Sequence, residues 1–300
     1  MAGGPTWELV GVPYTSARLP GGIAKGIGVL RSCALAERLA ESGVADAGDL
    51  DVEAPSGERG ESGLLNEGAL ERLVSDTRRQ VKAVFDRGGV PLLVGGDCPV
   101  ILGALAAIRD RGVAPGLVMF DGHEDAWPPQ LSETGEASDS EIAIALGRVP
   151  RLPGELAQLV PLLAPDGIFI VGARDLPEIL EAGAESIGDE IAFFADDQTV
   201  VSDPDAVERG LLHSLAEGAI DSFWLHVDLD ALGSEAFAPV DYPQPGGIGW
   251  DQLDRLTSAL AADPHCRGAS VVIYNPDLDP DLTGAEQVVA FTARLAAGDR

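Results

Sequence analysis

Residues 120–127 read FDGHEDAW and continue directly from the apolar run Leu117–Phe120, which is typical of a buried strand. Asp121, His123 and Asp125 occupy alternate positions, so they line one side if the extended geometry continues. Two carboxylates and an imidazole at the exit of a hydrophobic strand repel one another or go unsatisfied unless a cation binds them. The pattern predicts a divalent metal site, and a solvated loop with a chance spacing is the alternative.

Short apolar runs alternate with helical patterns along the whole chain. Strands are expected at Trp7–Val12, Val90–Val94, Gly116–Phe120, Gly167–Val171, Ser222–Val227 and Gly268–Ile273, and helices at Val29–Ser42, Ala69–Arg87, Pro99–Arg111 and Trp250–Ala262. This alternation predicts an α/β fold with a mostly parallel sheet that helices cover on both faces. Because no low-complexity linker or repeat divides the chain, residues 1–300 are expected to form one domain. The Gly-, Glu- and Ser-rich residues 50–66 are expected to form a surface excursion.

Composition excludes several classes of partner. The formal net charge of -29 repels nucleic acid and anionic lipid, so neither is expected to bind. No apolar stretch is long enough to span a membrane, and the first residues lack the pattern of a secretory signal. The cysteines, Cys33, Cys98 and Cys266, are too few and too scattered for a disulfide framework. A cytoplasmic protein is predicted.

Polar groups follow the other apolar strands as well. Gly95–Cys98 comes directly after one strand, and His226, Asp228 and Asp230 alternate along the end of another. In open α/β sheets, ligands bind beyond the carboxyl ends of the strands, so these groups are expected to meet. Together with the first motif they can hold a pair of metal ions that share bridging carboxylates. The predicted set is Asp121, His123, Asp125, Asp228 and Asp230.

The ordered motifs GGDC (95–98), DGHED (121–125) and DLD (228–230) resemble the three metal-binding motifs of the arginase/agmatinase ureohydrolase superfamily. Similar signatures occur at Gly11–Pro13, Gly26–Arg31, Ala47–Asp49, Gly172–Asp175, Pro245–Gly247 and Asn275–Pro276. The resemblance implies a single-domain three-layer α/β/α fold with an eight-stranded, mostly parallel sheet, assembled as a homo-trimer or homo-hexamer. It also implies hydrolysis of a C–N bond in a small guanidino or amidino substrate. The nucleophile would be a hydroxide that bridges two Mn(II) ions and is oriented by Asp125.

The resemblance also assigns metal ligands. One ion takes Asp121, His123, Asp228 and Asp230. The other takes Asp121, Asp125, Asp228 and the residue at position 98, where the family has a histidine and this chain has Cys98. A thiolate is softer than imidazole and shifts the preference from Mn(II) towards Zn(II) or Fe(II). The alternative is a small buried cysteine that leaves this second site weak or empty.

Two further family positions differ in this chain. The loop histidine that the family uses in proton transfer falls near Ser138, and the late glutamate that contacts the guanidinium falls near Ile273. A guanidinium cation still needs an anionic partner in a pocket that holds little water. The candidate substrate-binding residues are Glu136, Asp139, Glu178 and Trp127. The alternative for the acidic loop is a solvated turn before a helix at Ser140–Gly147, with Ser138 or Asp139 as its N-cap.

Trp127 and His226 are the most unusual residues beside the motifs. Trp127 stands where amino-acid-binding members tend to carry a small polar residue, which argues against arginine as the substrate. His226 precedes Asp228 by two and should face the metals, where the family usually has a small residue. It is a candidate catalytic proton carrier, an extra ligand or a partner of a ligand, and a core histidine bonded to a backbone carbonyl is the alternative. His213 and His265 are assigned no role.

Two other classes of function stay open at this point. A mononuclear metal-dependent amidohydrolase needs only one activating ion. A non-catalytic, metal-binding subunit of the same family needs the metal motifs but no substrate site. Retention of all five metal-binding groups named above argues against full decay of the site.

Overall fold

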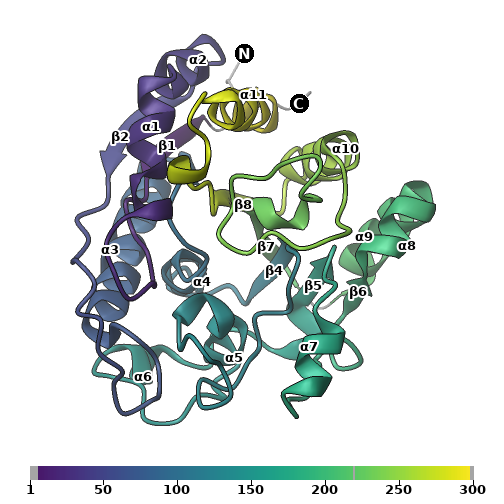
Figure 1. Cartoon of the computed structure of the whole chain (residues 1–300). Helices are drawn as coiled ribbons and strands as arrows, with labels where there is room; N and C mark the ends of the chain where they lie inside the picture. The colour runs from purple at the N-terminus through teal and green to yellow at the C-terminus, as the bar shows by residue number, and fades with distance from the viewer. Residues whose placement is uncertain (1–5, 219, 298–300) are drawn as a thin grey trace.

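The computed structural model describes residues 6–218 and 220–297. Within that part of the chain, all strands belong to one parallel sheet, in the order β2-β1-β3-β8-β7-β4-β5-β6 (Figure 1). The strands are β1 (Trp7–Gly11), β2 (Ala45–Asp49), β3 (Val90–Val94), β4 (Pro115–Phe120), β5 (Ile168–Val171), β6 (Phe193–Ala195), β7 (Ser222–Asp228) and β8 (Cys266–Val272). The predicted single-domain α/β fold with an eight-stranded parallel sheet is confirmed.

Helices cover both faces of this sheet. The α-helices are α1 (Gly26–Ser32), α2 (Leu35–Glu41), α3 (Glu67–Asp86), α4 (Val100–Arg109), α5 (Glu141–Ala145), α6 (Leu156–Leu159), α7 (Leu176–Glu181), α8 (Asp197–Ser202), α9 (Pro204–Glu217), α10 (Trp250–Ala261) and α11 (Thr283–Ala297). Helices α3 and α4 pack together on one face, and α10 and α11 pack together on the other (Figure 1). None of the described helices is long and apolar enough to cross a membrane.

The interior strands are buried along their whole length, which explains their sequence pattern. Every residue of β3, β4, β5 and β7 is buried. Strands covered on both faces show continuous apolar runs rather than alternation, and these runs made the interior of the sheet predictable. The two edge strands were not predicted. The sequence of β2, ADAGD, is mostly exposed, and β6 has three residues.

Three local expectations are wrong. The helix predicted at Val29–Ser42 is two helices, because the chain breaks at Ala34, which adopts a left-handed φ of 64°. The helix predicted at Ser140–Gly147 is the shorter α5, and its N-cap residue is Ser140 rather than Ser138 or Asp139. Residues 50–66 are not entirely a surface excursion, since Leu64 and Leu65 are buried.

The strand order decides where the site forms. β3 and β4 are successive along the chain, but β8 and β7 lie between them in the sheet. Loops that leave the carboxyl ends of β3, β7 and β4 therefore meet at a topological switch point, where open α/β sheets bind ligands. Gly95 and Gly96 have left-handed φ values of 88° and 68° and turn the chain out of β3. A Cβ atom on Gly96 would lie 2.5 Å from the Val12 carbonyl oxygen, so only glycine fits there.

Candidate active site

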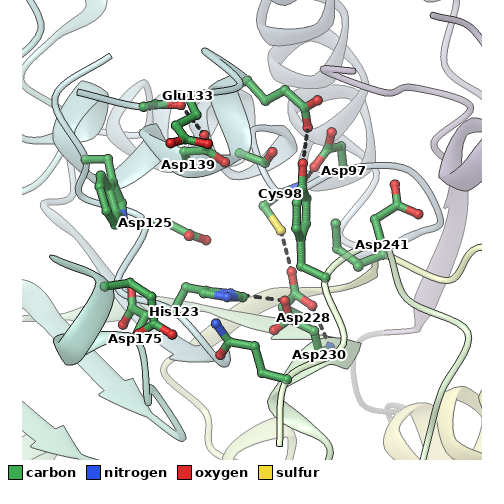
Figure 2. Close-up of a pocket in the computed structure, with 18 of the residues that line it drawn as sticks. Asp97, Cys98, His123, Asp125, Glu133, Asp139, Asp175, Asp228, Asp230 and Asp241 are labelled. Carbon is green, nitrogen blue, oxygen red and sulfur yellow. Dashed lines mark hydrogen bonds and ion pairs between the residues drawn. The ribbon is translucent and has the colours of Figure 1, made fainter. Parts of the chain in front are cut away.

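A cavity of about 710 Å³ opens at this carboxyl edge of the sheet. Eleven aspartate or glutamate side chains line it, and no lysine or arginine is among the described residues that do so. Figure 2 shows Asp97 and Asp241 on one wall, His123 and Asp125 on another, and Cys98 and Asp228 between them. Carboxylates packed at this density repel one another, so the cavity favours a cationic occupant.

The motif residues predicted to bind metal come together at the base of this cavity. Ligand atoms of Asp121, His123 and Asp125 lie within 4.8 Å of one another, and so do those of Asp121, Asp228 and Asp230. The four aspartates are buried, with exposed fractions of 6% or less. They come from the loop after β4 and from the end of β7, as the sequence pattern predicts.

Backbone amides hold these carboxylates in position. The amide of His123 donates to Asp121 Oδ1 at 2.8 Å, and the amide of Asp230 donates to Asp228 Oδ1 at 2.7 Å. Gly122 donates its amide to Asp230 Oδ1 at 2.9 Å, and His123 Nδ1 lies 3.1 Å from Asp230 Oδ2. Asp121 Oδ2 is buried and has no hydrogen-bond partner. A buried, unpaired carboxylate oxygen is costly unless a cation faces it, so the donor set fits a divalent ion.

Burial and mutual repulsion perturb the pKa values of these acids. Burial raises the pKa of Asp121 to about 7, and the nearby Asp230 carboxylate adds to the shift. The pKa values of Asp125 and Asp228 are also raised well above the usual range, mainly by burial. Burial alone would raise the pKa of Asp230, but the charge and hydrogen bond of His123 lower it. A divalent cation removes this conflict, because it favours the ionised form of every carboxylate around it.

Cys98 lies beside the predicted metal donors. Its thiol donates to Asp228 Oδ2 at 2.8 Å, and its side chain is 1% exposed. Burial raises the pKa of the thiol well above its usual value, and the Asp228 carboxylate raises it further. The sulfur belongs to two further groups of ligand atoms within 4.8 Å, one with Asp121 and His226 and one with Asp125 and Glu141. Ligation by Cys98 stays a prediction that this placement supports.

Sequence reasoning missed Glu141. The residue is fully buried at the start of α5, and its carboxyl group lies beside that of Asp125, close enough for the two groups to share a proton. Burial raises its pKa well above the usual range. The available signal was a glutamate at the head of the apolar segment EIAIA, 141–145, where an unpaired acid is expensive to bury.

His226 lies under the base of the cavity, fully buried on β7. Its Nδ1 lies 2.6 Å from the Ser270 hydroxyl, and its Nε2 has no partner. The alternative of a histidine satisfied by a backbone carbonyl is therefore wrong, since the partner is a hydroxyl. Burial lowers the pKa of the imidazole to about 3, although the Asp230 carboxylate opposes the shift. The ring is therefore neutral at physiological pH.

The residues predicted to bind the substrate all line the same cavity: Glu136, Asp139, Trp127 and Glu178. Ser138, the catalytic candidate at the loop position of the family's histidine, lines it as well. Ser138 Oγ lies 3.1 Å from Ser16 Oγ. Burial raises the pKa of Glu136 to about 8, and the Asp97 and Asp139 carboxylates add to the shift. Glu178 is exposed on α7. Ile273, which stands near the family's late glutamate, also lines the cavity.

Asp139 is less available than Glu136. Its Oδ2 accepts hydrogen bonds from the hydroxyls of Ser132 and Thr134, so this oxygen stabilises the loop that contains all three residues. Trp127 is tied to the same loop, since its amide donates to the Asp139 carbonyl at 3.0 Å. The acidic segment is therefore a built wall of the cavity rather than a solvated turn.

A sequence model described as the arginase family matches residues 7–298. The chain belongs to the arginase family. The curated arginase of Bacillus caldovelox is 24% identical over 299 residues, which cover 96% of this chain and 97% of that protein. Its crystal structure superposes with a TM-score of 0.83, at 23% identity, over 99% of both chains.

Other family folds are similar to this chain as well. The formimidoylglutamase of Bacillus subtilis gives a TM-score of 0.72 at 18% identity and covers 98% of this chain and 87% of its own. The agmatine ureohydrolase of Thermoplasma volcanium gives 0.71 at 18% identity, with 98% and 89% covered. These structures share the fold, and their names differ in substrate.

Proposed function

We propose that this arginase-family protein is a metal-dependent hydrolase that cleaves the C–N bond of a guanidino or amidino compound. The observation that carries the proposal is the meeting of five predicted metal donors beneath an acidic cavity: Asp121, His123, Asp125, Asp228 and Asp230. An apolar core does not require these groups, and burying them without a cation is costly. Membership of the arginase family supports the reaction class.

The chain's own residues divide the work. Asp121, which belongs to three of the four groups of possible donors in the described residues, and Asp228 would bridge two ions, with His123 and Asp230 on one side and Cys98 on the other. Mn(II) is the expected metal, and Zn(II) or Fe(II) suits the sulfur donor of Cys98. Such ions supply a water of lowered pKa as the nucleophile. Asp125, buried beside the bridging groups, would orient that nucleophile by accepting its proton in a hydrogen bond.

The substrate is expected to be a cation. Glu136 lies on the acidic loop at the cavity wall, where its carboxylate can accept hydrogen bonds from a guanidinium or amidinium group. Glu178, exposed on α7, is placed to hold a second positive group. Trp127 supplies an apolar face and stands where amino-acid-binding relatives tend to have a small polar residue. These features favour a guanidino or amidino compound other than arginine.

Ser138 is the candidate to replace the missing loop histidine in proton transfer. His226, which is buried, neutral and bonded through Nδ1 to Ser270, is less suited to carry a proton. Ser138 Oγ can pass a proton along its contact with Ser16, whose hydroxyl also donates to Asp97. A homo-trimer or homo-hexamer in the cytoplasm is the expected setting for this activity.

The deciding experiment combines metal analysis with a substrate screen. Protein loaded with Mn(II), Zn(II) or Fe(II) would be assayed for release of urea, ammonia or formamide from a panel of guanidino and amidino compounds. Activity is expected to fall below neutral pH, since protonation removes the hydroxide nucleophile. Asp125→Asn is expected to remove most turnover. No turnover by protein with two metals per subunit would favour the non-catalytic subunit, and cleavage of simple amides with one metal would favour the mononuclear amidohydrolase.

A further inference from the structure

His226 has one nitrogen that the folded chain leaves without a partner. The side chain is fully buried on β7, between the strands that carry Met119 and Ser270. Nδ1 contacts the Ser270 hydroxyl at 2.6 Å, whereas Nε2 makes no hydrogen bond. A buried polar nitrogen without a hydrogen-bond partner destabilises the folded protein. Since an apolar residue would fill this place at lower cost, packing alone does not account for the histidine.

The free nitrogen belongs to a cluster of possible metal donors. A His226 nitrogen, the Cys98 sulfur and an Asp121 oxygen all lie within 4.8 Å of one another. Nδ1 is engaged with Ser270, so Nε2 is the nitrogen left for this cluster, and Asp121 Oδ2 is likewise without a partner. Two ligands of one ion, each about 2.0–2.3 Å from it, lie no more than about 4.6 Å apart, so a group of atoms within 4.8 Å is close to the separation that one ion needs. The unpaired imidazole nitrogen therefore lies close to a buried carboxylate and a buried thiol.

Ser270 can support the form of the ring that binds a metal. Trp224 Nε1, which can only donate, gives a hydrogen bond of 2.9 Å to Ser270 Oγ. The hydroxyl oxygen has a second lone pair, which can accept the Nδ1 proton of His226. Metal-ligating histidines usually donate their other ring N–H to such an acceptor, which fixes the tautomer and leaves a lone pair on the ligating nitrogen. Trp224 and Ser270 thus support His226 from the side away from the cavity.

We propose that His226 ligates, through Nε2, the divalent ion on the Cys98 side of the site. This rests on the metal dependence of the proposed function. Position 98 lacks the imidazole expected there from the family, and His226 delivers an imidazole to the same ion from β7. Sulfur, nitrogen and carboxylate donors together suit Zn(II) or Fe(II) better than Mn(II). Cys98 and His226 therefore both ligate one of the two ions and change the set of ligand atoms around it.

Nitrogen NMR of the wild-type protein tests this directly. The chain has four histidines, so the imidazole ¹⁵N signals are few enough to follow during titration with Zn(II). The Nε2 signal of His226, assigned by its absence in His226→Gln, is expected to move to the range of metal-bound imidazole while Nδ1 stays protonated. His213, exposed on α9, is expected to remain unchanged. An unshifted His226 signal at saturating Zn(II) would overturn the proposal.

Variants provide a second measurement. In competition with a chelator, His226→Gln is expected to lower the affinity for one of the two Zn(II) ions per subunit by at least about tenfold and to leave the affinity for the other unchanged. The control His213→Gln is expected to bind both ions with wild-type affinity. Ser270→Ala is expected to weaken the same ion by a smaller factor. Equal affinities in His226→Gln and wild type would contradict ligation. A shift of the His226 Nε2 signal in a protein without turnover would contradict the proposed hydrolase activity but not the ligation by His226. Turnover without that shift would contradict the ligation alone. A protein that binds no Zn(II) would contradict both.

Discussion

The Cys98 thiol donates a hydrogen bond to Asp228 Oδ2 at 2.8 Å, across the gap between the loop after β3 and the end of β7 (Figure 2). The other oxygen of this carboxylate, Asp228 Oδ1, accepts a hydrogen bond from the Asp230 amide. The thiol proton thus occupies the face of Asp228 that a bridging metal would use. Binding of a cation there must displace this proton, which makes Cys98 the residue on which the number of metals depends.

Cys98→Ala is expected to lose about one metal per subunit while the ion held by Asp121, His123, Asp228 and Asp230 remains. Elemental analysis of protein dialysed at saturating metal measures this. Cys98→His is expected to raise the affinity for Mn(II) relative to Zn(II), because imidazole is the harder ligand. Thiol reagents should label Cys98 faster in metal-free protein, and Co(II) substitution should give a sulfur-to-metal charge-transfer band. Unchanged stoichiometry in Cys98→Ala would show that the cysteine is only packing.

Asp121→Asn and Asp228→Asn are each expected to remove nearly all bound metal, since both carboxylates would bridge. The change is nearly isosteric and takes away a buried charge, so the metal-free variants should fold at least as stably as the metal-free wild type. Metal content and thermal midpoint with and without metal are the measurements. Asp166→Asn, at an exposed residue by the amino end of β5, is the matched control. Full metal content in either site variant would refute the bridging assignment.

The interior of the fold was readable because β3, β4, β5 and β7 are buried on both faces. The edge strands were not, since β2 is exposed and β6 is too short to leave a pattern. The break at Ala34 was also hidden, because alanine is the best helix former and neither glycine nor proline occurs in residues 31–37, RSCALAE. Tertiary packing, which buries Leu35 and Leu39, decides the path there.

Some residues of the candidate site could be placed from the sequence and others could not. Motif residues at strand ends, such as Asp121 and Asp228, could be placed from the sequence because parallel strands bring their carboxyl ends together. Glu141 could not, since its helix follows an irregular loop whose path no periodicity reveals. The sequence did indicate the side of the strand on which His226 lies, but not that Ser270 leaves its Nε2 unpaired.

Glu136→Gln tests the electrostatics of the acidic loop. The pKa of Glu136 is raised from 4.5 to about 8, first by burial and then by Asp97 and Asp139, so the carboxylate ionises only above that pH. KM for a cationic substrate should therefore fall as pH rises from 7 to 9 in the wild type, and this fall should be much smaller in the variant. KM is measured because the metal-bound nucleophile also affects kcat in this range. Equal pH dependence of KM in the two proteins would exclude Glu136 from substrate binding.

The raised pKa of Glu136 also makes the stability of the folded protein depend on pH. A carboxyl whose pKa is raised by folding contributes stability that is present below its unfolded pKa and is lost as pH rises through the folded value. Metal-free wild type should lose stability relative to Glu136→Gln between about pH 4.5 and pH 8, and the two proteins should differ least at pH 4. Thermal melts across that range measure the difference. A constant difference in thermal midpoint would argue that Glu136 is not perturbed in the folded protein.

Ile273 is the position at which a designed change should restore part of the family's substrate site. The residue lines the cavity and is 6% exposed, and its φ of 73° is unfavourable for a β-branched side chain. Ile273→Glu removes the branching and places a carboxylate beside the bound cation. Hydrogen bonds to charged groups contribute about 1.5–3 kcal/mol, so KM for a guanidino substrate should fall by about tenfold or more.

Ile273→Gln is the control, since it has the same length without the charge. The added carboxylate joins an already acidic cavity, so the metal-free Ile273→Glu protein should melt at a lower temperature than Ile273→Gln, and metal should narrow the gap. Both variants relieve the same backbone strain, so strain relief cannot make them differ. A lower melting temperature of Ile273→Glu without metal, together with its lower KM for a cationic substrate, would therefore show an electrostatic effect of the carboxylate. If the two variants had the same KM, the cavity wall near residue 273 would not contact the guanidinium, and the anionic contact would have to come from the Glu136 loop alone.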